Sequence, residues 1–263
     1  MGKFLHDLFH KVLGLPPLAS EQGRDVDDLV IYVHWLMIAL FIGWLVYFAY
    51  TLVRFRRSRN PKADYAGVRG HYSNYLEITV VIAEAVLLLG FAIPLWAKAV
   101  GEFPKKENST VIQVVAQQFA WNVRYSGADG KLGKQDMHLV SESNLFGVDP
   151  GDPASKDDIQ LQNQIHVPVN KPVIVELSSK DVIHSFKIIA MRVTQDAIPG
   201  MRIPLHFTPT QVGRYQINCA QLCGMGHANM AAGFVTVDTK EDYEKWLATQ
   251  KPVGAGGGGS VAE

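Results

Sequence analysis

Four side chains that bind soft metal ions lie within twelve residues near the end of the sequence. They occur in the only segment that contains cysteine, and they are Cys219, Cys223, His227 and Met230. Gly224 and Gly226 lie between them and disfavour a helix, so the segment is expected to form a loop.

Strand-like sequences on either side are expected to hold this loop. Residues 213–219 alternate between polar and apolar, and residues 233–237 resume the alternation. His184 follows a polar turn at the start of another such segment. It is the best second histidine for a site formed by the loop.

Thiolate, imidazole and thioether together are the ligand set of copper electron-transfer sites. The second cysteine exceeds what one such copper needs, whereas two thiolates can bridge two copper ions. Two alternatives remain open, a Cys219–Cys223 disulfide and a tetrahedral zinc site of two cysteines and two histidines. Neither alternative uses Met230.

Two apolar segments are expected to cross a membrane as a hairpin within residues 25–100. Residues 29–53 contain no Asp, Glu, Lys or Arg, and residues 76–97 form the second span. The connection between them is basic, which predicts that it is cytoplasmic and that both the N-terminus and residues after Lys98 lie outside. Residues 1–24 are expected to form an interfacial segment that begins with an amphipathic helix.

Short alternating segments dominate residues 101–250 and predict an antiparallel, all-β sandwich. Residues 141–160 are rich in turn-forming residues and are expected to form an excursion loop. A helix at 241–249 closes the domain, and the Gly-rich residues 251–263 are expected to be a flexible tail.

Three motifs occur in order behind the two spans: Asp-Val-Ile-His-Ser-Phe at 181–186, Gln-Asp-Ala-Ile-Pro-Gly at 195–200, and the cysteine loop. This combination resembles subunit II of haem–copper cytochrome c oxidase, which carries the CuA centre. The resemblance implies a cupredoxin-like sandwich on the periplasmic side of the bacterial inner membrane. It also implies two copper ions, bound by His184, Cys219, the backbone carbonyl of Gln221, Cys223, His227 and Met230.

The resemblance further implies that electrons arrive from cytochrome c or another c-type cytochrome and leave for the haems of subunit I, with subunit III as a further partner. Members of the family usually have two tryptophans where electrons enter, and here Phe119 and Trp121 take these places. The alternative is that both side chains only pack the sandwich.

Four acidic or amide positions are further candidates for a role. Gln221 replaces a glutamate that reaches a magnesium or manganese ion in the family, which weakens that site because an amide is a poorer ligand. Asp196 is the nearest acid that could compensate. Glu77 matches a residue at the cytoplasmic end of a proton path, whereas Glu84 is expected either to relay protons or to bond the large subunit.

Other classes of function fit the sequence less well. The 25 basic and 25 acidic residues balance, which gives no general affinity for nucleic acid, and the absence of Cys-x-x-Cys-His excludes a c-type haem in this chain. A copper chaperone would have one span. The dicopper domain of nitrous oxide reductase is soluble, and a quinol oxidase subunit lacks the ligands.

Overall fold

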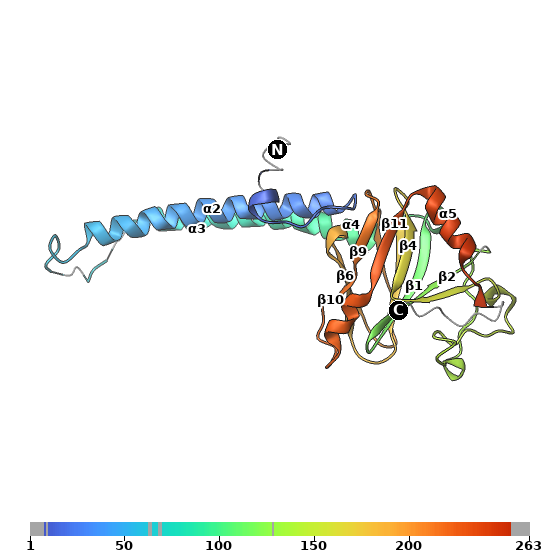
Figure 1. The fold of residues 1–263 in the computed structure, drawn as a ribbon. Coiled ribbons are helices and arrows are strands. Elements are labelled where there is room, and N and C mark those ends of the chain that lie inside the picture. The colour runs from blue at the N-terminus through green and yellow to red at the C-terminus, as the bar shows by residue number, and fades with distance from the viewer. Residues whose placement is uncertain (1–7, 9, 63–64, 68–69, 128, 254–263) are drawn as a thin grey trace. The chain divides into compact units, whose positions relative to one another are not determined.

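The computed structural model describes residues 8, 10–62, 65–67, 70–127 and 129–253. The chain divides into two compact units, one formed by residues 1–15 and 25–98 and the other by residues 16–24 and 99–263 (Figure 1). Most of the predicted interfacial helix at 1–14 and residues 254–263 of the predicted tail lie outside the described residues.

The first unit is built on two long apolar helices. Helix α2 covers Gly23–Arg54, and α3 (Tyr72–Leu87) continues through a π-helical turn at Leu88–Ala92 into α4 (Ile93–Gly101). Both helical stretches are long and apolar enough to cross a membrane. They extend beyond the predicted 29–53 and 76–97 because polar residues at the ends continue the helices.

The second unit consists of three sheets. The five-stranded sheet has the order β3-β2-β1-β5-β8, and two three-stranded sheets have the orders β10-β6-β7 and β4-β11-β9. The strands are β1 (Thr110–Gln117), β2 (Ala120–Tyr125), β3 (Ile159–Gln162), β4 (Gln164–Pro168), β5 (Val173–Ser179), β6 (His184–Ile188), β7 (Val193–Ala197), β8 (Ile203–Phe207), β9 (Gly213–Gln216), β10 (Asn218–Cys219) and β11 (Phe234–Asp238). Helix α5 (Lys240–Thr249) follows the last strand.

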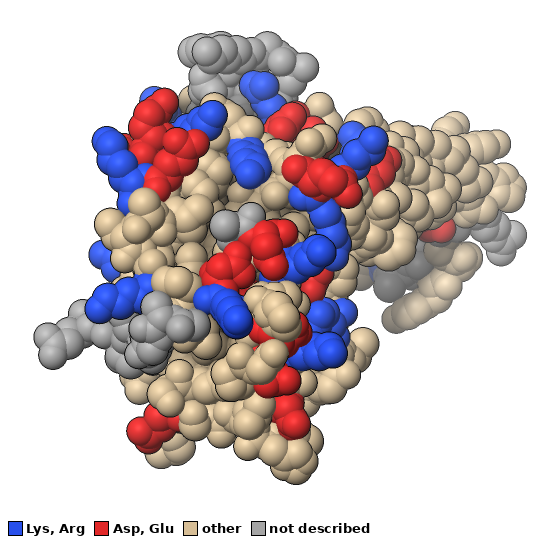
Figure 2. Space-filling view, turned by 90° about the vertical axis from the view of Figure 1, so that its right-hand side faces the viewer, with Lys and Arg blue, Asp and Glu red and all other residues tan. Residues whose placement is uncertain are grey.

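One buried core joins the three sheets and makes the unit a sandwich. Val114 of the large sheet packs in the same cluster as Phe186 and Val235 of the two smaller sheets. Outside the core, Lys and Arg are interspersed with Asp and Glu on one face of this unit (Figure 2). The predicted fold class, two apolar helices followed by a cupredoxin-like β sandwich, is confirmed.

The prediction of a purely antiparallel sandwich was wrong in two places. Strands β1 and β5 pair in parallel, and so do β4 and β11. The alternation of side chains that marks a strand is the same for both directions, so it could not distinguish them. Strand β3 was also missed, because its residues lie partly in the segment expected to be an excursion loop.

Residues 16–24 form a strap on the β unit. The backbone N–H of Ala19 donates to Ala190 O at 2.8 Å, and the N–H of Glu21 donates to Thr208 O at 3.0 Å. The Ala19 side chain is fully buried in the sandwich core. A fragment that began at residue 101 would lack these contacts, so the full chain is the appropriate molecule for experiments.

A buried ion pair fixes the loop between β2 and β3. Arg124 and Asp158 are both buried and contact each other, and Arg124 Nη2 also donates to Gly133 O at 2.7 Å. The backbone N–H of Gly133 donates to the Asp158 carboxylate at 3.1 Å. The pair therefore ties the end of the excursion segment, and Gly133 before that segment, to strand β2.

Replacing Asp158 with Asn should destabilise the β unit by about 3–5 kcal/mol, because the Arg124 charge would remain buried without its counter-charge. Chemical denaturation of the full chain in detergent measures this loss. Glu142→Gln, an exposed change in the same excursion segment, should shift stability by no more than about 0.5 kcal/mol. Equal stability of the two variants would contradict a structural role for the pair.

Candidate metal centre

Strand pairing brings His184 and Cys219 to one face of a sheet. Strand β10 pairs antiparallel with β6, with Cys219 opposite Phe186. Side chains two residues apart on a strand share a face, so His184 lies on the same face as Phe186 and, across the strands, Cys219. The imidazole is fully buried there.

The loop between β10 and β11 turns back to bring in the second cysteine. Gly224 has a φ of +133°, a conformation that favours glycine, and a 3₁₀ turn at His227–Ala232 follows. The Cys223 side chain is buried beneath this turn. Cys223 and His227 therefore approach the sheet face that carries His184 and Cys219.

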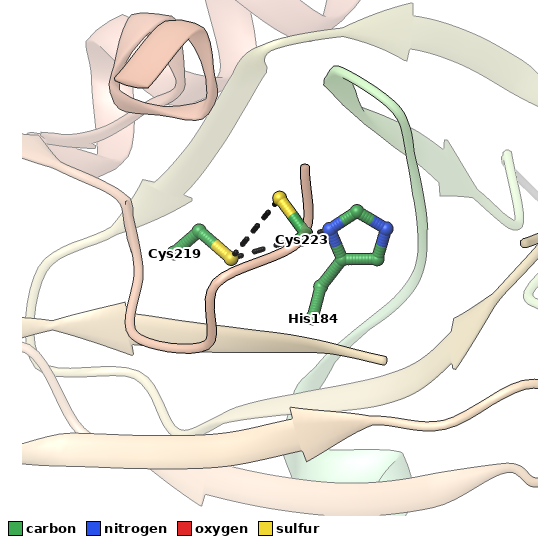
Figure 3. Close-up of side chains that lie close together, drawn as sticks. All are labelled: His184, Cys219 and Cys223. Carbon is green, nitrogen blue, oxygen red and sulfur yellow. Dashed lines mark hydrogen bonds between the residues drawn. The ribbon is translucent and has the colours of Figure 1, made fainter. Parts of the chain in front are cut away.

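The four predicted side chains converge. Cys219 Sγ lies 3.9 Å from Cys223 Sγ and 4.0 Å from His184 Nδ1. Figure 3 marks both contacts with dashed lines. Cys223 Sγ also lies 3.4 Å from His227 Nδ1. A disulfide requires about 2.05 Å between the sulfurs, so these two thiols are not bonded to each other.

This donor set fits a soft metal ion. The ligand atoms of His184, Cys219 and Cys223 all lie within 4.8 Å of one another. Metal–sulfur bonds of about 2.3 Å allow two sulfurs at the observed separation to contact the same ion. The Cys219 thiol also lies 3.0 Å from the backbone oxygen of Gln221, which places that carbonyl at the edge of the group.

The cysteines must lose protons before they bind a metal. Burial raises the pKa of the Cys223 thiol to about 11, and the neighbouring Cys219 adds to the rise. Without a metal, this thiol is therefore protonated at neutral pH. Metal binding must release the proton, because the thiolate is the ligand.

Asp181 fixes the orientation of the His184 ring. The ring Nε2 lies 2.9 Å from Asp181 Oδ1, and a ring that donates from Nε2 to this carboxylate presents Nδ1 to the sulfurs. Burial raises the Asp181 pKa, but hydrogen bonds from His184 and from the backbone N–H groups of Gln118 and Val182 outweigh it, so the pKa is lowered. The carboxylate is therefore ionised at neutral pH.

The turn between β1 and β2 forms hydrogen bonds with the segment before His184 and with the cysteine loop. The Gln118 backbone N–H donates to Asp181 Oδ2 at 2.7 Å, and its side-chain Nε2 donates to Cys223 O at 2.6 Å. The Phe119 ring lies over Gly226, where an added Cβ would come within 2.4 Å of it. Glycine is therefore required at position 226 for this close approach.

Trp121 lies behind the metal ligands rather than at the surface. Its side chain is fully buried, and its Nε1–H donates to Met230 O at 2.9 Å. Its ring meets the His184 ring edge-on at 6.2 Å between centroids. Met230 is buried in the turn that follows His227. Of the two predicted aromatic residues, only Phe119 is partly exposed.

The side chains of the remaining predicted site residues are exposed. Asp196 is exposed on β7, where it pairs with Ser185 of β6. Glu77 and Glu84 are exposed on α3 in the other unit. The Gln221 side chain is also exposed.

Sequence reasoning assigned no role to Gln118 or Asp181. An acid three residues before a histidine, in a polar turn, was the available signal for Asp181. Gln118 offered no such signal, because its two bonds join segments that lie 63 and 105 residues further along the chain.

Asp181→Asn should lower the metal affinity of the apo chain by about 10–100-fold, because the amide removes the charged partner of the ligand imidazole. Competition with a copper chelator measures the affinity. The control is Asp129→Asn, an exposed change in the loop after β2, which should leave the affinity unchanged. An unaltered affinity in Asp181→Asn would show that this bond does not prepare the ligand.

Comparison with known proteins assigns the family. The family described as "Cytochrome C oxidase subunit II, periplasmic domain" matches residues 110–237. The alternative cytochrome c oxidase subunit 2 of Bradyrhizobium diazoefficiens is 30% identical over 236 residues, which cover 89% of this chain and 83% of that protein. The cytochrome c oxidase subunit 2 of Cereibacter sphaeroides is 29% identical, over 89% of this chain and 78% of that protein.

Among solved structures, the periplasmic domain of subunit II of cytochrome oxidase of Bradyrhizobium japonicum is 29% identical, with a TM-score of 0.41 over 56% of this chain and 94% of that one. The extent of the match to the relative from Bradyrhizobium diazoefficiens, together with the matched periplasmic domain, is decisive. The chain belongs to the cytochrome c oxidase subunit II family.

Proposed function

We propose that this chain is the subunit through which electrons enter a respiratory terminal oxidase. The observation that carries the proposal is the convergence of two unbonded thiols and two imidazoles in one part of the β unit. The electron donor is cytochrome c or another c-type cytochrome. The electrons pass to the haems of subunit I, where oxygen reduction is coupled to proton pumping.

The residues that would hold the cofactor are those predicted from the sequence. Cys219, Cys223, His184 and His227 would hold two copper ions, with Met230 and the Gln221 carbonyl as further ligands. When bound, such a pair would accept and release one electron with little nuclear rearrangement, because both ions share the change in charge.

The protein contributes a rigid frame for these ligands. Strand pairing positions His184 and Cys219, while Gln118 holds the loop that carries Cys223. Trp121 packs against His184 and anchors the backbone at Met230, so a ligand cannot move without disturbing the core. Frames of this kind keep a site in one geometry while its charge changes.

The proposal also includes the position of the chain in the membrane and its contacts with other subunits. The two apolar helices would span the bacterial inner membrane against subunit I, with subunit III as a further partner and the β unit on the periplasmic side. Glu77 would lie at the cytoplasmic end of a proton path, and Glu84 would face the large subunit. Asp196 would compensate in part for Gln221 if a magnesium or manganese ion lies at that interface.

The full chain, expressed without its own metal and then loaded, should bind two copper ions per chain. Cys219→Ser should lose this copper and the oxidation of cytochrome c by the assembled complex, because a hydroxyl is a poor ligand for copper. Elemental analysis and oxygen uptake measure the two effects. One copper per chain would favour a chaperone, and preferential retention of zinc would favour a structural site.

Phe119→Leu should slow reduction of the copper site by cytochrome c severalfold while the copper content stays unchanged, because the ring covers the ligand loop at its partly exposed side. Stopped-flow reduction measures the rate. Phe234→Leu is the control, since that ring packs against Arg214 instead. An unchanged rate in Phe119→Leu would exclude this residue as the point where electrons enter.

A further inference from the structure

Large apolar side chains are exposed in the same segments that supply the metal ligands. Leu222 is 79% exposed and Met225 is fully exposed, and both lie within the cysteine loop. Val182 and Ile183 are exposed immediately before His184. We call these four residues the apolar rim.

Contacts between backbones and side chains place the segments of the rim next to one another. Gln118 bonds both Asp181, which precedes Val182, and Cys223, which follows Leu222. Phe119 packs on Gly224 and Gly226, the two neighbours of Met225. The segments that carry the rim therefore adjoin the partly exposed Phe119 and the ligand loop.

The segments that supply and brace the ligands contain few charged residues. No Asp, Glu, Lys or Arg occurs from 219 to 230 or from 117 to 121. In the third segment Lys180 and Asp181 have opposite signs, and both have partners. Lys180 Nζ donates to Gln117 Oε1 at 3.0 Å, and Asp181 accepts from Gln118.

We infer that the electron donor docks on the apolar rim through an uncharged, apolar surface around its haem edge, rather than through lysines that meet acidic residues. This inference rests on the proposed function. Exposed apolar side chains whose charged neighbours have opposite signs and bonded partners mark a contact surface and offer little for electrostatic steering. The donor class is therefore a c-type cytochrome with a neutral docking face.

The first test is the salt dependence of donor oxidation by the complete oxidase. Two probes are used: mitochondrial cytochrome c, which is basic, and a c-type cytochrome of near-zero net charge. Between 20 and 500 mM salt, the second-order rate constant for the neutral probe should change less than about threefold, and the basic probe should show no advantage at low salt. A fall of tenfold or more with the basic probe, together with faster low-salt oxidation of it, would overturn the inference.

The second test removes the apolar contacts without adding charge. The double variant Leu222→Gln/Met225→Gln should raise KM for the neutral probe about tenfold or more, while kcat at saturating donor and the copper content stay unchanged. The matched control is Met137→Gln/Leu139→Gln, which alters an exposed Met and Leu in a different loop. An unchanged KM in the first double variant would overturn the inference.

Two further outcomes are distinguishable. Loss of the haem subunit from the purified Leu222→Gln/Met225→Gln complex would show that the rim is a subunit interface, which overturns donor docking there but not the copper site. Failure of the unaltered chain to bind copper would overturn the proposed function itself, and the inference with it.

Discussion

The structure depends on holding two thiol sulfurs close together without letting them bond. At 3.9 Å, Cys219 and Cys223 are too far apart for a disulfide and close enough to share an ion. Flexible cysteines four residues apart would not keep this separation. The separation is kept because one cysteine belongs to a strand pair and the other lies beneath a turn that packs into the core.

Three elements distant in sequence share this task. Strand β6 supplies His184, the loop after β10 supplies the other ligands, and the β1–β2 turn bonds to both. The glycines of the loop matter for the same reason, since a side chain at 226 would collide with the Phe119 ring. Gln118 and Phe119, the residues of the β1–β2 turn that contact the ligand segments, are also exposed or partly exposed at the surface.

Much of this could be predicted from the sequence, because ligand type and spacing are local properties. The cysteine loop, His184 and the two apolar helices were recognisable from residue types alone. The parallel pairing of β1 with β5 was not, since alternation carries no direction. Gln118 was missed for a related reason: its role consists of two long-range hydrogen bonds, which no local pattern encodes.

Electron paramagnetic resonance of the oxidised, copper-loaded full chain tests the central claim most directly. If two thiolates and two imidazoles bind a pair of ions, one unpaired electron should show hyperfine coupling of similar strength to two copper nuclei. Coupling to a single copper nucleus in a chain that binds copper fully would contradict the account.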